Sequence, residues 1–291
     1  MRLFRHKTVL YGERRLSPFL LLYFLICAFL LLQAAGAPRR IEITAHRGYS
    51  AQYPENTLAA FRGAIALGAD CIELDVRQTA DGVPVVLHDA SLLRTTGWDR
   101  DIGDVTYAEI RKLDDGSWYS SQFSGERIPT LEEVLRLAKH GGVELNVELK
   151  PEGNGTLART VADLLRQYGM RGRCVVTSAN YELLKEIKRC DSRIKTGYIT
   201  SIIPTHATGM KDADAFSVRA AFLSAAGVRR LHAADKQVFA WTVNTGDAMR
   251  NMIAFGVDDL ITDNPRLAMT EVSSASESGL SQAFASVFFP S

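Results

Sequence analysis

The feature that most constrains this chain is a regular alternation of short β-branched runs with longer helical stretches, which begins at Ile41 and continues to about Leu267. Strands are expected over 41–45, 71–77, 83–88, 143–149, 174–177, 196–200, 213–218, 237–242 and 258–262, and helices over 57–67, 131–140, 155–168, 181–189, 224–233 and 246–255. Strands that alternate with helices predict a parallel sheet covered by helices. About eight barrel strands favour a closed (β/α)8 barrel, the α/β TIM barrel, over an open sheet of five or six strands.

Length and composition agree with one large domain, expected over residues 41–267. The chain has 291 residues, of which 46% are hydrophobic, enough to bury a single core of barrel size. The segment from about 90 to 129 is rich in Asp, Gly, Ser and aromatic residues and is too long for an ordinary connection. We therefore expect a small insertion after the third strand, with short helices of its own. A Ser-rich tail over 271–291, expected to be mobile at first, follows the barrel.

The N-terminus has the pattern of an export segment. Apolar residues fill 19–32, five Lys and Arg residues precede them, and only two follow closely. This bias predicts a basic N-terminus in the cytoplasm and a barrel outside it. The apolar core is as short as that of a signal peptide, and Ala35-Gly36-Ala37 resembles a cleavage site, yet the whole run is long enough for a membrane anchor. Residues 1–37 are thus expected to comprise a basic cytoplasmic N-terminus and one hydrophobic helix, which is either the signal peptide of a secreted protein or an anchor to the cell membrane.

Charge and cysteine usage point away from two classes of function. The 34 Lys and Arg residues against 33 Asp and Glu residues leave a formal net charge of +1, so no global field attracts the chain to nucleic acid. The four cysteines lack the spacing of a metal site or a disulfide framework. Buried thiols are expected at Cys71 and Cys174, with a Cys174–Cys190 bridge as the alternative in an oxidising compartment.

Two carboxylates share one face of an expected strand. Glu73 and Asp75 alternate along the apolar run 71–76, so both side chains point the same way. Strands of a parallel barrel are covered on both sides, which argues against a solvated edge strand, and if this face is the barrel interior the two anions share a site of low dielectric constant. Like charges about 4 Å apart cost on the order of 4 kcal/mol at an effective dielectric constant near 20, so a proton or a cation should accompany them. The alternation therefore indicates a metal site.

A third carboxylate, Glu148, lies near the end of the strand expected over 143–149. Three carboxylates from two strands favour Ca²⁺ or Mg²⁺, because these hard cations prefer oxygen ligands. Lys150 shares the face of Glu148, two residues further along. Its ammonium group is interpreted either as a contact for substrate phosphate or as a balance for the carboxylates.

Two histidines follow strand ends. His46 and Arg47 follow the first strand, and His88 ends the run 83–88, so all three are expected at the rim where barrel active sites lie. One imidazole can deprotonate an attacking oxygen while the other protonates a leaving alkoxide, as phosphodiester cleavage requires. A metal and Arg47 would neutralise charge on the phosphoryl oxygens. Trp241 ends another strand and forms either an apolar wall for the substrate or part of the core.

These motifs, in this order and spacing, resemble the glycerophosphodiester phosphodiesterase family. The matching motifs are His46-Arg47-Gly48, Pro54-Glu55-Asn56-Thr57, Glu73-Leu74-Asp75-Val76, His88-Asp89, Glu148-Leu149-Lys150, Trp241-Thr242-Val243-Asn244 and Thr262-Asp263-Asn264-Pro265. The resemblance covers roughly residues 41–267 and implies a TIM barrel with an insertion after the third strand. Ser217-Val218-Arg219 departs from the family pattern, in which an Asn-Pro dipeptide is common, and this leaves the pocket wall on that side undefined.

The resemblance also implies roles and a reaction. By position these roles are a metal site of Glu73, Asp75 and Glu148, an acid/base pair of His46 and His88, and phosphate contacts from Arg47 and Lys150. The implied reaction converts a glycerophosphodiester and water into sn-glycerol 3-phosphate and an alcohol, through a cyclic phosphate if the glycerol hydroxyl attacks first. Alternatives are a lysophospholipase D-like or phospholipase C-like enzyme on membrane lipids, or a catalytically silent module that binds phosphodiesters or envelope polymers. A pure binder needs no proton shuttle, which argues against the silent module.

Overall fold

The computed structural model of the protein describes Tyr23, residues 40–150 and residues 155–288, with side chains described up to residue 277. Residues 40–280 form one compact unit. Apart from Tyr23, the N-terminal segment expected over 1–37 lies outside the described residues. Within the described part of the chain, no helix combines the length and the apolar character needed to span a membrane.

Eight parallel strands of residues 40–280 close into a barrel, in the order β1, β2, β4, β5, β6, β7, β8, β9 and back to β1. Their bounds are Glu42–Ala45 (β1), Cys71–Gln78 (β2), Glu144–Leu149 (β4), Cys174–Ser178 (β5), Lys195–Thr200 (β6), Ala215–Arg219 (β7), Gln237–Trp241 (β8) and Asp259–Thr262 (β9). Closure is visible in the register of β1, where Ala45 pairs with Ile72 of β2 on one side and with Thr262 of β9 on the other. The expected α/β TIM barrel is confirmed.

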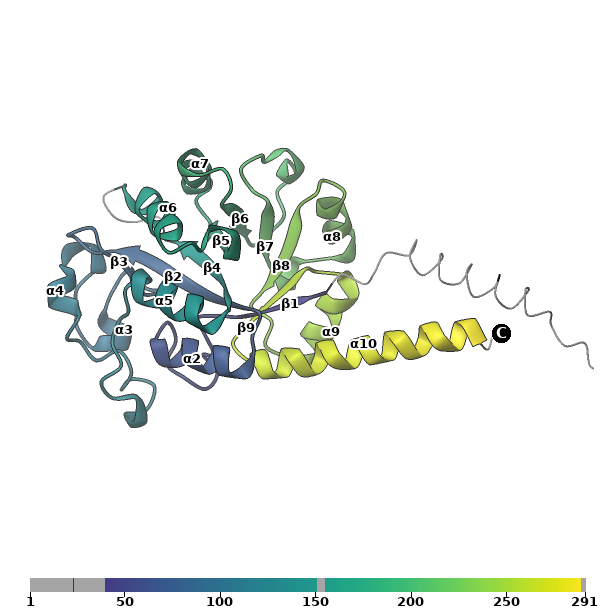
Figure 1. Cartoon of the computed structure of the whole chain (residues 1–291), viewed down its shortest axis with the longest axis horizontal. Helices are drawn as coiled ribbons and strands as arrows, with labels where there is room; N and C mark the ends of the chain where they lie inside the picture. Colours follow the sequence, from purple (N-terminus) through teal and green to yellow (C-terminus); the bar gives the residue numbers. More distant parts are fainter. Residues whose placement is uncertain (1–22, 24–39, 151–154, 289–291) are drawn as a thin grey trace, which may run out of the picture. The chain divides into compact units, whose positions relative to one another are not determined.

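Helices surround the strands (Figure 1). They are Leu58–Leu67 (α2), Leu131–Gly141 (α5), Leu157–Gln167 (α6), Tyr181–Cys190 (α7), Ala225–His232 (α8), Gly246–Phe255 (α9) and Pro265–Phe288 (α10). Several begin at side chains that accept orphan backbone N–H groups. In α5, for example, Thr130 and Glu133 form a capping box, and Gly142 ends the helix with a φ of 74°, a left-handed conformation that glycine adopts without strain.

The two faces of β2 explain how the sequence places the site. Ile72, Leu74 and Val76 are almost completely buried in the core between the barrel and the helices. The alternate residues Glu73 and Asp75 point to the barrel interior and are also buried, at 4% and 1% exposure. Outward apolar packing fixes the register of this strand, because a slip by one residue would bury the carboxylates among the helices.

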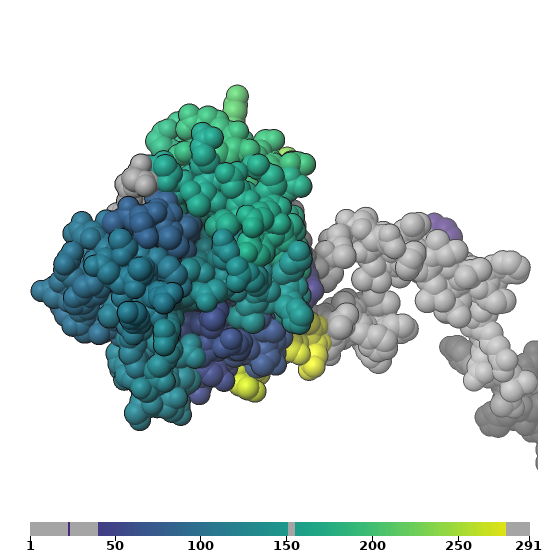
Figure 2. All heavy atoms as spheres, turned by 60° about the vertical axis from the view of Figure 1, so that its left-hand side comes forward, coloured from purple at the N-terminus to yellow at the C-terminus, as the bar shows by residue number. Residues whose placement is uncertain are grey.

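The prediction that residues 83–88 form the third strand of the barrel is wrong. β3 (Pro84–Val86) runs antiparallel to the end of β2 and takes no part in the barrel. Residues after it form two short α-helices, Leu93–Thr96 (α3) and Tyr107–Ile110 (α4), and two 3-10 helices, Ile102–Asp104 and Ser121–Phe123. This insertion has a small apolar core of its own around Leu92, Ile102 and Ile110. In Figure 2 it stands out from the barrel as a blue and teal lobe.

Two further expectations concern the tail and the thiols. The tail expected over 271–291 is helical as far as Phe288, because α10 begins at Pro265 and continues through the Ser-rich sequence. Cys71 and Cys174 are buried free thiols, as expected, and Cys190 is also free, so the alternative Cys174–Cys190 bridge is absent among the described residues. Burial raises the pKa of the Cys174 thiol to about 12, and the thiol is therefore unreactive.

Asp259 on β9 makes the stability of the barrel depend on pH. Its carboxyl group is 2% exposed and accepts a hydrogen bond from the Thr44 hydroxyl at 2.6 Å. Burial raises its pKa to about 8, against an ordinary value of 3.8. Between these values the folded state retains a proton that the unfolded chain has released, so the free energy of unfolding falls as the pH rises through this window.

Replacement of Asp259 by Asn is expected to remove this part of the pH dependence, because the amide cannot ionise. Urea unfolding at about pH 5 and at about pH 9 measures the change: the wild-type chain should lose more stability between these values than the variant. Equal losses in both chains would show that Asp259 is not the group that takes up the proton on folding.

Candidate active site

Seven of the eight residues singled out in the sequence line one cavity of about 300 Å³. These residues are His46, Arg47, Glu73, His88, Glu148, Lys150 and Trp241. The eighth, Asp75, is buried beside the cavity and contacts Lys150. His46 follows β1, Lys150 follows β4 and Trp241 ends β8, so the cavity lies at the carboxyl ends of the strands, where TIM-barrel active sites lie.

The three carboxylates form one cluster. Glu73, Asp75 and Glu148 each offer an oxygen atom, and these oxygens lie within 4.8 Å of one another. Burial, together with Asp75, raises the pKa of Glu73 to about 8, so the chain by itself does not stabilise three full negative charges here. Burial and Asp75 also raise the pKa of Glu148. Carboxylate oxygens at this spacing, two of them on buried residues and one on a half-buried residue, fit a hard divalent cation, which would supply the missing positive charge.

Lys150 pairs with two of these carboxylates. Its Nζ lies 2.8 Å from Asp75 Oδ1 and also contacts Glu148 Oε1. Burial would raise the pKa of Asp75, but Lys150 and then Arg47 outweigh this effect and hold that pKa well below its usual value. The ammonium group therefore balances the carboxylates, one of the two roles considered for it. Because an ammonium group has three N–H donors, one remains for a group in the cavity.

The turn after β1 aims a backbone N–H at the carboxylate cluster. Arg47 has a φ of 56°, in the left-handed region that non-glycine residues seldom adopt, and its N–H donates to Glu73 Oε2 at 2.9 Å. The next residue, Gly48, also has a positive φ, and a Cβ atom there would lie 2.7 Å from the Cβ of Ala60. Close packing against α2 therefore requires glycine in the His46-Arg47-Gly48 turn.

His46 is held by a carboxylate that directly follows the last strand, β9. Its Nδ1 lies 2.6 Å from Asp263 Oδ1, and its Nε2 lies 4.0 Å from Glu73 Oε2. Asp263 in turn accepts hydrogen bonds from Ser50 and from Asn244. Since an ionised carboxylate only accepts hydrogen bonds, Nδ1 of His46 carries the proton and Nε2 faces the cavity. Burial lowers the pKa of His46, but the hydrogen bond to Asp263 and the charge of Glu73 outweigh it, and the pKa is raised.

His88 has a matching arrangement, although it does not follow a barrel strand. Its Nδ1 lies 2.7 Å from Asp89 Oδ1. Its carbonyl oxygen accepts two hydrogen bonds from the guanidinium group of Arg77 on β2, at 2.9 and 2.6 Å. These contacts bring His88 to the barrel cavity from the insertion side.

A model of the glycerophosphoryl diester phosphodiesterase family matches residues 46–267, which contain seven of the eight barrel strands and all of these side chains. The chain belongs to this family. A glycerophosphodiester phosphodiesterase from Caldanaerobacter subterraneus subsp. tengcongensis is 35% identical over 233 residues, which cover 77% of this chain and 94% of that one. Membership confirms the expected family and, with it, the enzyme class.

Solved structures of the same family superpose on this phosphodiesterase. An Oleispira antarctica phosphodiesterase in complex with its product sn-glycerol-3-phosphate is 32% identical, with a TM-score of 0.76 over 80% of this chain and 96% of that one. A glycerophosphodiester phosphodiesterase from Agrobacterium tumefaciens is 28% identical, with a TM-score of 0.71 over 79% of this chain and 99% of that one. Each match covers almost the whole length of the solved structure.

Trp241 forms one wall of the cavity of this phosphodiesterase. The ring packs on the apolar layer inside the barrel, which includes Phe239 and Ile261, and its indole N–H donates to the carbonyl oxygen of Ser217 at 3.0 Å. Ser217 also lines the cavity. Although the sequence departs from the family pattern at 217–219, the backbone of Ser217 still provides the hydrogen-bond acceptor that fixes the indole ring.

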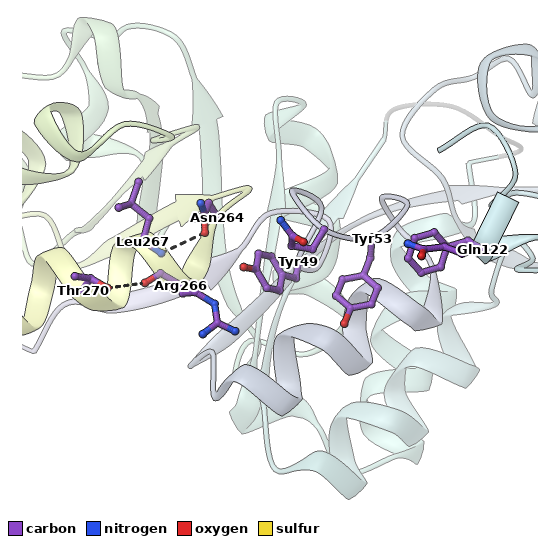
Figure 3. Close-up of a pocket in the computed structure, with 9 residues that line it drawn as sticks. Tyr49, Tyr53, Gln122, Asn264, Arg266, Leu267 and Thr270 are labelled. Carbon is purple, nitrogen blue, oxygen red and sulfur yellow. Dashed lines mark hydrogen bonds between the residues drawn. The ribbon is translucent and has the colours of Figure 1, made fainter. Parts of the chain in front are cut away.

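A larger groove of about 910 Å³ lies outside this cavity. In Figure 3, Tyr49 and Tyr53 line one side of the groove, and Arg266 and Thr270 of α10 line the other. A hollow of about 570 Å³ shares His46 and Arg47 with the active-site cavity and Asn264 with this groove. None of the three clustered carboxylates lines the groove, so the reacting groups lie in the smaller cavity.

Sequence reasoning assigned no role to the side chains that hold the two histidines. Both side chains belong to motifs that match the family: Asp263 directly follows the expected strand 258–262, and Asp89 directly follows His88. An acidic residue at such a position is a signal that could have identified them. Glu55 also lies in a matching motif. Arg94, in the insertion, contacts both Asp89 and Glu55, and no spacing rule predicts that contact.

Proposed function

We propose that this phosphodiesterase hydrolyses glycerophosphodiesters to sn-glycerol 3-phosphate and an alcohol, with a divalent cation and two histidines as the catalytic groups. The observation that supports this most is the arrangement around one cavity: two imidazoles, each held at Nδ1 by a carboxylate, beside three clustered carboxylates. The bound product in the Oleispira antarctica structure supports the same product for this chain.

Glu73, Asp75 and Glu148 would hold the cation, Ca²⁺ or Mg²⁺. When bound, such an ion polarises the phosphoryl group and stabilises its developing charge. The chain itself contributes Arg47, whose guanidinium group lies between Glu55 and Asp75 and lines the cavity, and the spare N–H of Lys150. The side chains of Arg47 and Lys150 would contact phosphate oxygens, and Trp241 would offer an apolar surface to the glycerol or head group.

The two histidines would move the protons. Nδ1 of each ring donates to a carboxylate, so Nε2 of each ring is the free nitrogen. One Nε2 takes the proton of the attacking water or glycerol hydroxyl as the new P–O bond forms. The other, protonated beforehand, gives its proton to the alkoxide as the old P–O bond breaks, so the alcohol leaves neutral. If the glycerol hydroxyl attacks, water then opens the cyclic phosphate with the roles exchanged: the ring that gave its proton takes one from water, and the ring that took a proton returns it to the glycerol oxygen as its bond to phosphorus breaks.

Phosphorus-31 NMR of the products tests the reaction class against its rivals. Glycerophosphocholine should give glycerol 3-phosphate. A lysophospholipase D-like enzyme would instead give lysophosphatidate from lysophosphatidylcholine and leave glycerophosphocholine intact, and a phospholipase C-like enzyme would accumulate a cyclic phosphate. A folded, cation-loaded chain that converts none of these substrates would favour the silent binding module.

We also propose that residues 1–37 export the barrel, as a signal peptide or as a membrane anchor. The proposal is supported by the apolar run over 19–32 behind a basic N-terminus. N-terminal sequencing of the protein isolated from the membrane and from the medium decides between the two forms. An intact chain found in the cytoplasmic fraction would contradict both.

A further inference from the structure

A single guanidinium group from the insertion joins the partners of two active-site residues. Arg94, on α3, donates from Nε to Asp89 Oδ2 at 2.5 Å, and its two terminal nitrogens lie 3.1 and 2.8 Å from the two oxygens of Glu55. Asp89 holds His88 through its other oxygen. Glu55 holds Nη1 of Arg47 at 2.8 Å. A continuous chain of hydrogen bonds therefore runs from His88 through Arg94 to Arg47.

The contacts of Arg94 suit orientation more than simple charge balance. All three nitrogens of its planar fork are used, two of them in a bidentate pair with Glu55, which fixes the plane of the group. The indole ring of Trp118, also in the insertion, lies under the guanidinium carbon at 5.5 Å from the ring centroid and supports the same plane. The hydrogen bond from Arg94 is the main reason that the pKa of Asp89 is lowered to about 2, so Asp89 stays an acceptor.

We propose that Arg94 is a positioning residue of the active site, which orients His88 through Asp89 and Arg47 through Glu55. The inference rests on the proposed function, since it assumes that His88 transfers a proton and that Arg47 contacts phosphate. It makes the insertion a working part of the site: the barrel supplies His46 and the carboxylates, and the insertion fixes the geometry of the second histidine. Arg94 bridges the carboxylates of Asp89 and Glu55, so its removal would leave each of them without this hydrogen-bond donor.

The experiment compares Arg94→Gln, Arg94→Lys and the control Arg100→Gln in the full chain, with glycerophosphocholine and saturating cation. Arg100 lies in the same insertion and contacts the Trp98 ring and the Asp104 carbonyl oxygen instead of the site. Arg94→Gln is expected to lower kcat roughly 10- to 100-fold and to raise KM, as for other partners that orient a reacting group. Arg94→Lys should recover only part of this loss, because an ammonium group keeps the charge but lacks the fork.

Two further measurements exclude a merely structural role. If Arg94 acts through Asp89, the losses of Arg94→Gln and Asp89→Asn should be less than multiplicative in the double variant. The imidazole NMR signals of His88 should shift in Arg94→Gln and stay in place in Arg100→Gln, a readout that does not depend on turnover.

Unchanged kcat, KM and His88 signals in Arg94→Gln would overturn the inference while the wild-type chain still releases product. Fully multiplicative losses would do so too, since they would show that Arg94 and Asp89 act independently. A wild-type chain that is loaded with cation and releases no product refutes the proposed function instead, and the NMR comparison then decides whether Arg94 still orients His88.

Discussion

Replacing His88 with alanine is expected to lower kcat for glycerophosphocholine hydrolysis by roughly 10²- to 10⁴-fold, and His46→Ala by a similar factor, since each removes a positioned proton donor or acceptor. Affinity for the divalent cation should change little, because neither imidazole belongs to the carboxylate cluster. Steady-state kinetics measure the first effect, and calorimetric titration with Ca²⁺ or Mg²⁺ measures the second.

His140→Ala is the matched control for these variants. His140 lies exposed near the end of α5 and does not line the cavity, so the kinetics of this variant should match those of the wild-type chain. Turnover near the wild-type rate in both His46→Ala and His88→Ala would refute the assignment of proton transfer to these rings. A loss in only one of them would mean that a single histidine, with water, carries both transfers.

Glu73→Gln is expected to weaken binding of the divalent cation on the order of 100-fold and to lower activity at a fixed, limiting cation concentration. Glu73 is buried in the cluster, and its pKa is raised to about 8 by burial and by Asp75, so a bound cation would favour its ionised form at neutral pH. The amide of Gln keeps the shape of the side chain but cannot supply that charge. Calorimetric titration of the chelator-treated protein measures the change.

Glu144→Gln gives the matched control for this variant. Glu144 begins β4, the strand that carries Glu148, but it lies exposed at the opposite end. Its replacement should leave cation affinity unchanged. Titration curves that coincide for the wild-type chain and for Glu73→Gln would reject the metal site and leave Lys150 and Arg47 as the compensating charges of the cluster.

The parts of the site on barrel strands could be predicted from the sequence. Side chains alternate between the two faces of a strand, and barrel strands are covered on both faces, so the alternation of Glu73 and Asp75 with Ile72 and Leu74 favoured two carboxylates inside the barrel over a solvated edge strand. The position of His46 followed in the same way, because the residue after a barrel strand lies at its catalytic rim.

The parts outside the barrel could not be predicted in this way. The run 83–88 has the composition of a barrel strand, but the antiparallel pairing of β3 with β2 is a tertiary choice that local sequence does not specify. His88 still reaches the cavity, for a different reason: its carbonyl oxygen is bound by Arg77. The contacts of Arg94 depend on how the insertion folds back on the barrel, and neither periodicity nor spacing encodes that.

The helix α10 shows a second limit. Its Ser-rich stretch over 271–277 looks like a mobile tail by composition, yet the residues before it, including Ala268, pack against the apolar core of the barrel and start the helix at Pro265. Once that first turn is fixed by packing, serine continues the helix at little cost, because nucleation is the expensive step.

The most direct test of the proposed function is release of glycerol 3-phosphate from glycerophosphocholine by the wild-type chain, measured with Ca²⁺, with Mg²⁺ and with a chelator. Release that requires one of the ions and stops with the chelator is the predicted result, since the three carboxylates would then hold the cation that the reaction needs. Release that continues at the same rate after the chelator has removed all bound ion would contradict the metal-assisted mechanism.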